Sequence, residues 1–95
     1  MLAGGWNESS ELSQEEYTMV VELQPQVHEH AGKEFHHFHP IAIKKQVVAG
    51  TNFFVKVQVG ETECVHVKIF RPLPHTGEPA SVTEVHIDKT LDDAI

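Results

Sequence analysis

The chain has 95 residues, of which 40% are apolar and 22% charged, as in globular rather than disordered proteins. This length fits one compact domain with one modest core, so we predict that residues 1–95 form a single domain. The formal net charge of −7 argues against a nucleic-acid partner, because such binding depends on Lys and Arg side chains that neutralise phosphates.

The opening segment, "MLAGGWNESSE", has neither a basic start nor an apolar run of secretory length, and no later stretch reaches membrane-spanning length. We therefore expect no membrane partner and a cytoplasmic location. The single cysteine, Cys64, cannot form an intramolecular disulfide, which fits a reducing compartment. Residues 1–11 are polar and contain glycine, so we expect a mobile N-terminal trunk before the first element.

One helix is predicted to begin after Ser13. Ser13 and Glu16 have the spacing at which two side chains cap a first helical turn reciprocally. The apolar residues of one helical face then follow at steps of three and four: Val20, Leu23, Val27 and Ala31. Gly32 is a suitable end for this helix. Pro25 removes one helical hydrogen bond and predicts a kink near residues 21–25.

Beyond Phe35, apolar residues recur at every second position, which is the period of a β-strand. We predict four strands, at about 36–49, 52–60, 64–72 and 81–89. Short connections such as "VGETE" make neighbouring strands antiparallel. One long helix laid across one face of this sheet would bury both apolar surfaces, which defines an α+β fold.

The segment "QVVAG", residues 46–50, places two valines at the tip of the first predicted hairpin. Turns usually face water, where Ser, Asn, Asp and Gly suit the backbone better than Val does. Successive strand residues point to opposite faces, so one of these valines can face the core. Val47 and Val48 are therefore either core residues or part of a contact surface.

Three motifs in combination resemble the stefins, the intracellular type 1 cystatins that inhibit papain-like cysteine proteases. The motifs are a glycine a few residues from the start, "QVVAG" continuing as "TNFFVKVQVG", and "VHVKIF" followed by "LPH" at residues 73–75. Each motif alone is weak, whereas the combination at these spacings is specific and covers nearly the whole chain. The resemblance implies a cystatin-like fold, a curved four- to five-stranded antiparallel sheet wrapped around one long helix.

The resemblance also implies a function, which is reversible, tight and competitive inhibition of papain and cathepsins without a cofactor or a catalytic residue. Three segments would form a wedge that enters the active-site cleft of the protease and is not cleaved. The protease-binding residues that it implies are Leu2, Ala3, Gly4, Gln46, Val47, Val48, Ala49, Gly50, Leu73, Pro74 and His75. Gly4 and Gly50 would let the backbone turn tightly against the enzyme, and Pro74 would stiffen its loop.

Each segment of this wedge also has a plainer interpretation. The N-terminal glycines are then a flexible tail, and residues 73–75 are a surface loop. Trp6 either contacts the protease or covers the sheet edge. On this interpretation the chain is a binding or structural domain on the same scaffold, with no protease target.

Two further chemistries stay open at this point. "HEH" at residues 28–30 and "HHFH" at residues 36–39 offer imidazoles, the side chains that often bind zinc, but no Cys or acidic residue joins them at a familiar ligand spacing. Cys64 and His66 share a strand face, as a nucleophile and its base would, without an evident acid to orient the histidine. A solvated histidine-rich surface and a coincidental pair are the simpler alternatives.

The expected oligomeric state is a monomer with a strand-exchanged dimer as its alternative. The first hairpin joins two long strands, and straightening it would give one continuous strand shared between two chains. That exchange would draw "QVVAG" out of the wedge.

Overall fold

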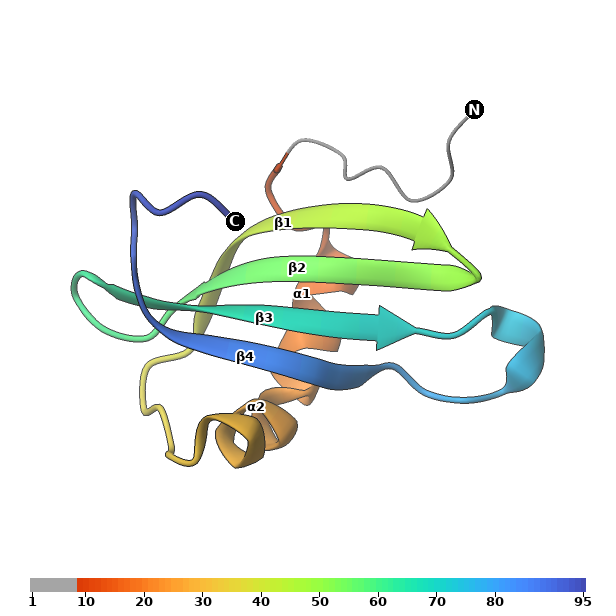
Figure 1. The fold of residues 1–95 in the computed structure, drawn as a ribbon, viewed down its shortest axis with the longest axis horizontal. Helices are drawn as coiled ribbons and strands as arrows, with labels where there is room; N and C mark the ends of the chain where they lie inside the picture. Colours follow the sequence, from red (N-terminus) through yellow and green to blue (C-terminus); the bar gives the residue numbers. More distant parts are fainter. Residues whose placement is uncertain (1–8) are drawn as a thin grey trace.

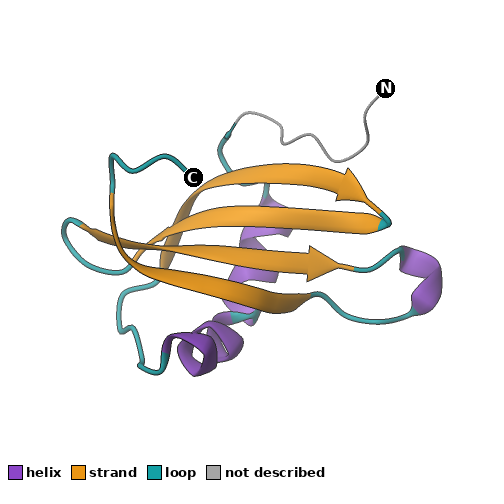
Figure 2. Ribbon diagram, viewed as in Figure 1, coloured by secondary structure: helices purple, strands orange, loops and turns teal. Residues whose placement is uncertain are grey.

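The computed structural model describes residues 9–95, which form two helices packed against a four-stranded sheet (Figure 1). The elements are α1 (Gln14–Glu22), α2 (Gln24–Ala31), β1 (His39–Val48), β2 (Gly50–Gln58), β3 (Glu63–Arg71), the 3-10 helix η1 (Pro74–Thr76) and β4 (Ser81–Thr90). The strands lie in the order β1-β2-β3-β4, and each pairs antiparallel with the next. Figure 2 shows the sheet and helices as separate layers, which confirms the predicted α+β cystatin-like class.

Helix α1 begins as the sequence predicts. The Ser13 hydroxyl accepts a hydrogen bond from the Glu16 backbone N–H at 3.1 Å, and the Glu16 carboxylate accepts one from the Ser13 N–H at 2.9 Å. This reciprocal pair satisfies two N–H groups that have no partner inside the helix. At the other end, Gly32 adopts the left-handed conformation with φ of 74° and donates to the His28 carbonyl. The predicted start and end are both confirmed.

The prediction of one long helix is wrong, because the helix is interrupted at Leu23, which separates α1 from α2. The Leu23 N–H still donates to the carbonyls of Met19 and Val20, at 3.2 and 3.1 Å, so α1 closes there. Pro25 then lies in the first turn of α2, where its missing N–H costs little. The position of the predicted kink is therefore confirmed, but its result is two helices. Val20 and Val27 are both fully buried, so the apolar face continues across the break.

The bounds of β1 and β2 differ from the predicted ones, and these strands end at Val48 and Gln58 rather than at residues 49 and 60. Strand β1 begins at His39 rather than at residue 36, because its partner β2 ends at Gln58, directly opposite His39. Strand β2 begins at Gly50 rather than at residue 52, because only Ala49 separates it from β1. Strands β3 and β4 lie within one residue of their predicted bounds. Among residues 9–95 the sheet has four strands, and Ser10 adds only an isolated bridge to Ile43.

The two faces of the sheet carry different residues because strand side chains alternate. The inner face packs on the helices, and its buried residues are Ile43, Phe53, Val55, Val57, Val65, Val67, Ile69 and Val82. The outer face carries Phe54 and Lys56 of β2, opposite Lys68 and His66 of β3. No helix among residues 9–95 has the length and apolar character needed to cross a membrane.

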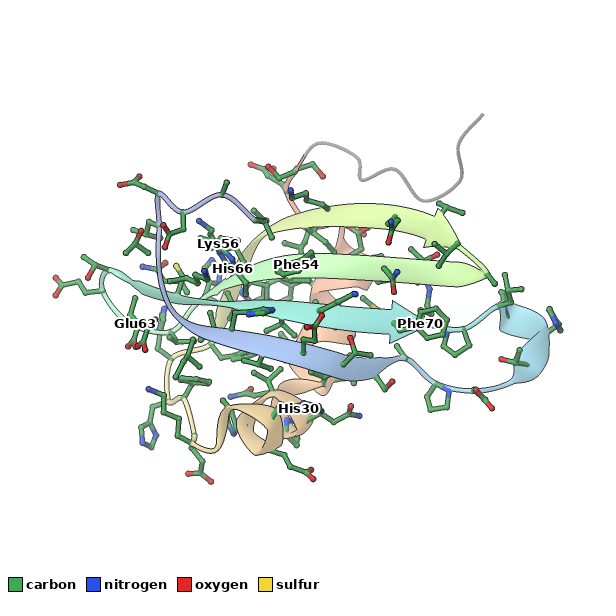
Figure 3. The ribbon with its side chains drawn as sticks, viewed as in Figure 1. His30, Phe54, Lys56, Glu63, His66 and Phe70 are labelled. Carbon is green, nitrogen blue, oxygen red and sulfur yellow. The ribbon has the colours of Figure 1, made fainter. Side chains whose placement is uncertain are left out.

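The outer face is partly covered by the last residue of β4 and the segment that follows it. Lys56 is only 5% exposed, and its Nζ donates to the backbone carbonyls of Thr90 at 3.1 Å, Leu91 at 2.7 Å and also Asp93. The Asp93 carboxylate in turn accepts a hydrogen bond from the Thr90 N–H at 2.7 Å. Figure 3 shows Lys56 next to His66 on this face. We call Lys56 together with residues 90–93 the C-terminal clamp.

Candidate functional site

The turn between β1 and β2 exposes its apolar side chains. Val47 is 60% exposed and Val48 is 37% exposed, so neither valine belongs to the core. Val48 pairs with Gly50 across the turn, and Ala49 forms the bend between them. Residues 47–50 are called the apolar turn from here on. Its exposure excludes the interpretation that these valines are core residues.

Gly50 is required by contacts inside the molecule. Its φ of 122° is a conformation that residues with a side chain rarely adopt. A Cβ at this position would lie 2.6 Å from the Arg71 carbonyl oxygen and 2.9 Å from Cζ of Phe70. The sequence interpretation explained this glycine by close approach to an enzyme, whereas the structure shows a second reason within the fold. Phe70 was not among the predicted site residues, and its role depends on the register of β2 against β3.

Gln46 joins the two strands of the first hairpin. It lies opposite Asn52, whose Nδ2 donates to Gln46 Oε1 at 2.9 Å. The pair spans β1 and β2 just before the apolar turn, so it holds the two arms of the hairpin together where they enter the turn.

The second predicted segment, residues 73–75, lies in the connection between β3 and β4. Leu73 is 39% exposed, and His75 is exposed in the short helix η1 that starts at Pro74. The Thr76 backbone N–H and hydroxyl both donate to the Leu73 carbonyl, at 3.1 and 2.8 Å. Gly77 closes the turn with a φ of 69°. These local bonds fix the loop while leaving the Leu73 side chain in solvent.

The apolar turn and the 73–75 loop lie at the same end of the sheet (Figure 1). Thr51, which follows the turn, pairs with Arg71, which precedes the loop. Between the two segments is an open hollow of about 610 Å³, and both Gly50 and Leu73 line it. The structure thus brings two of the three predicted segments together. The third segment, Leu2, Ala3 and Gly4, lies outside the described residues, as does Trp6.

Glu15 of α1 and Arg71 of β3 are charged residues that line this hollow. The Arg71 guanidinium lies over the Phe53 ring at 4.9 Å and 3.7 Å from a carboxylate oxygen of Glu15. Glu16 forms a 2.7 Å ion pair with Lys45. Burial acts to raise the pKa of Glu16, but the hydrogen bonds from Lys45 and Ser13 outweigh it, so the pKa lies below its ordinary value.

The histidines near residues 28–39 were candidates for a metal site. His28 accepts a hydrogen bond from the Phe35 N–H at 3.2 Å and packs edge-on against the Phe35 ring. The rings of His37 and His39 lie 6.4 Å apart. Among residues 9–95, no group of three or more His, Cys, Asp or Glu side chains is placed to hold a metal ion. The histidine-metal alternative finds no support in this part of the chain.

Cys64 and His66 do not form a nucleophile and base. Cys64 is fully buried, and burial raises the pKa of its thiol, which disfavours the thiolate. His66 is 3% exposed, its Nε2 has no hydrogen-bond partner among residues 9–95, and burial with the charges of Lys56 and Lys89 lowers its pKa to about 4. Neither group is poised for proton transfer near neutral pH.

Comparison with known proteins gives consistent matches over the chain. Residues 26–92 match a family model described as Cystatin domain. Leukocyte cysteine proteinase inhibitor 1 of Sus scrofa is 38% identical over all 95 residues, which cover 92% of that relative. Cystatin-A of Homo sapiens and Cystatin-B of Mus musculus are 33% and 32% identical, again over the whole chain and over 97% of each relative.

Proposed function

The chain belongs to the cystatin family, and from this premise we propose that it inhibits papain-like cysteine proteases such as papain and cathepsins. It is not an enzyme on this proposal, and it needs no cofactor. A relative that is 38% identical carries the name cysteine proteinase inhibitor, which supports the general activity. The finer proposal is that inhibition is reversible, tight and competitive.

The observation that carries the proposal is the apolar turn beside the 73–75 loop. Val47, Val48 and Leu73 are exposed apolar side chains at one end of the sheet. Small apolar side chains fit the wall of a narrow cleft without leaving buried polar groups unpaired, which would cost about 1–3 kcal/mol each. The local hydrogen bonds of the 73–75 loop, on Leu73 and Gly77, order it before binding and so lower the entropy lost on association.

The proposed contact set is the full wedge. It comprises Leu2, Ala3, Gly4, Gln46, Val47, Val48, Ala49, Gly50, Leu73, Pro74 and His75. Gly4 would let the chain turn away before the catalytic sulfur, so that no peptide bond is presented for attack. Gly4→Glu should then raise the dissociation rate from papain roughly tenfold to a hundredfold, through overpacking at a close contact. An unchanged dissociation rate would reduce the wedge to its two loops.

The decisive experiment is steady-state inhibition of papain by the unaltered protein and by matched charge substitutions. Val48→Asp and Leu73→Asp should each raise the inhibition constant at least about a hundredfold, because a buried unpaired carboxylate costs several kcal/mol. Ile87→Asp is the control, since Ile87 on β4 is 40% exposed, close to the 37% and 39% of Val48 and Leu73. Unchanged inhibition by both turn and loop variants would contradict the proposed surface. Failure of the folded, unaltered protein to inhibit any papain-like protease at micromolar concentration would favour a non-inhibitory binding domain.

The proposal extends to the state of the chain. Residues 1–95 would act as one inhibitory domain with residues 1–11 as its trunk, in the cytoplasm, where the buried free thiol of Cys64 would stay reduced. A monomer would be active, whereas a dimer that exchanges strands through a straightened Ala49 bend would lose the apolar turn and hence inhibition. Equal inhibition by separated monomer and dimer would contradict this last point.

A further inference from the structure

The ring of Phe70 lies in the space beside Gly50 that a side chain at residue 50 would need. Its Cζ and Cε1 atoms are 2.9 and 3.0 Å from the position of a Cβ on Gly50. The Arg71 carbonyl oxygen is closer still to that position, at 2.6 Å. The end of β3 is therefore packed tightly under the apolar turn, with an aromatic ring over a glycine, an arrangement that compensates for the missing side chain of a strand glycine.

Phe70 also stands in line with the hydrogen-bonded pair that joins the hairpin arms. Gln46, Asn52 and Phe70 are register partners across β1, β2 and β3, so their side chains share the outer face. Asn52 and Gly50 share the same face of β2, because they are two residues apart. Figure 3 shows Phe70 at the end of β3, beside the connection that carries Leu73. The ring thus lies against the first residue of β2, directly after the bend of the apolar turn.

We propose that Phe70 is a positioning residue that holds the apolar turn in the geometry needed for binding. This inference rests on the proposed function. Glycine has the greatest backbone freedom of any residue, so a turn that contains it samples many conformations unless something covers it. Val47 and Val48 are exposed and give the turn little support of their own. The Phe70 ring restricts Gly50 from one side, which lowers the ordering entropy lost when a protease binds.

The test compares two phenylalanines of the outer face. Phe70→Leu removes the ring over Gly50, and Phe70→Tyr restores it. The control is Phe54→Leu, because Phe54 is also half-buried on the outer face but stacks against His86, with ring centroids 6.0 Å apart, away from Gly50. Phe70→Met gives a second variant with an unbranched side chain if Phe70→Leu fails to fold. All variants are compared for amide hydrogen exchange at residues 48–51 in the free protein and for the rate of dissociation from papain.

Phe70→Leu should speed both amide exchange at residues 48–51 and dissociation from papain, each by about tenfold, which corresponds to a loss of one modest packing contact. Phe70→Tyr should restore both rates to within about twofold of the unaltered protein. Phe54→Leu should lower the unfolding free energy but leave both rates within the same margin.

Equal effects of Phe70→Leu and Phe54→Leu would overturn the inference, because Phe70 would then be an ordinary packing residue. Absence of papain inhibition by the unaltered protein would instead overturn the proposed function and with it the role of Phe70 in binding, whereas unchanged exchange at residues 48–51 in Phe70→Leu would overturn this inference alone.

Discussion

At one end of the sheet Val47, Val48 and Leu73 are exposed to water, whereas at the other end Lys56 is buried beneath residues 90–93. Burying a Val or Leu side chain fully stabilises a fold by about 1.5–3 kcal/mol. The fold does not gain this full stabilisation from the exposed apolar side chains at the open end. The C-terminal segment covers the outer face at the clamped end but not the apolar turn. Contacts within the fold therefore explain the clamped end, whereas the proposed function assigns the open end to an external partner.

The largest loss of stability is expected from a substitution of Gly50, at the open end of the sheet. In Gly50→Ala the new methyl group meets the Arg71 carbonyl and the Phe70 ring, and the φ of 122° becomes strained. We expect a loss of about 3 kcal/mol in unfolding free energy, the sum of a strained backbone and an overpacked contact. Urea denaturation gives this value, and papain dissociation should accelerate in the same variant.

Gly60, in the turn at the clamped end, is the matched control for Gly50. A Cβ there would come no closer than 3.4 Å to the Glu63 side chain, and Gly60 has no positive φ. Gly60→Ala should therefore change the unfolding free energy by less than about 1 kcal/mol and leave papain dissociation unchanged. Equal losses at Gly50 and Gly60 would show that the packing of β3 under the apolar turn has no special role.

The second prediction concerns loss of the hydrogen bonds that Lys56 makes in the C-terminal clamp. Lys56→Met keeps an unbranched side chain, one atom shorter, but removes the ammonium that donates to the backbone carbonyls of Thr90, Leu91 and Asp93. Hydrogen bonds to a charged group contribute more than neutral ones, so we expect a loss of about 2–3 kcal/mol in unfolding free energy. Amide exchange of Thr90 should accelerate, because its N–H bonds to Asp93 only while the segment is folded.

The same variant should leave papain inhibition intact, because the clamp lies at the end of the sheet away from the apolar turn. Lys68→Met provides the comparison, since Lys68 forms a partly exposed 3.6 Å ion pair with Glu84. Such a pair contributes about 0–1 kcal/mol. If Lys56→Met weakened inhibition as strongly as Val48→Asp, the two ends would be coupled and the contrast between them would fail.

The third prediction is that acid lowers the stability of the fold through protonation of His66, which lies next to Lys56 of the clamp. Burial, with the charges of Lys56 and Lys89, lowers the pKa of His66 from 6.5 to about 4. The unfolded chain thus binds a proton between about pH 6.5 and 4 that the folded chain refuses, so stability falls as the pH drops through this window. The negative charge of Asp93 opposes this lowering of the pKa, and the charge of His86 adds to it. We expect His66 to account for a loss of about 2 kcal/mol between pH 7.5 and pH 5.

Unfolding of His66→Phe measures this contribution, because the variant lacks the titrating group. Its stability should fall less than that of the unaltered protein over the same pH range, by the amount assigned to His66. His30→Gln removes one exposed histidine from α2 and should retain the pH dependence of the unaltered protein. Parallel curves for all three proteins would show that His66 is not the source of the acid sensitivity.

The elements that the sequence predicted well are those controlled by local chemistry. The reciprocal caps of Ser13 and Glu16 involve neighbours in the chain, and strand alternation follows from residue spacing alone. Pro25 marked the position of the helix break, but whether the chain bends or ends one helix and starts another depends on the hydrogen bonds that packing permits at Leu23. The sequence predicted a kink there and could not predict two helices.

The unpredicted features join residues far apart in the chain. Lys56 reads as a polar strand residue, and its burial depends on carbonyls 34 to 37 residues later. Phe70 fits an alternating pattern like any strand aromatic, and only the register of β3 against β2 places it against Gly50. The resemblance did identify the apolar turn and the 73–75 loop as candidates and implied that they form one wedge. The residues alone left open whether Val47 and Val48 are core or contact residues, and their exposure in the three-dimensional structure decides this.

The smallest effect is a gain in stability expected from a substitution in β4, the strand that leads into the C-terminal clamp. Asp88 has a φ of 61°, the left-handed conformation, and lies in a bulge where Ile87 and Asp88 face the single residue Val65. A non-glycine residue there costs roughly 1 kcal/mol, although Asp tolerates it better than most, so Asp88→Gly should raise the unfolding free energy by about 0.5 kcal/mol. Glu84→Gly, in the extended part of the same strand, should lower it by about 0.5–1 kcal/mol because glycine weakens a regular strand. Thermal unfolding distinguishes the two signs, and papain dissociation should be unchanged in both. A destabilised Asp88→Gly would show that the Asp side chain itself supports the bulge, and the strand that leads into the clamp would then already be at its best local sequence.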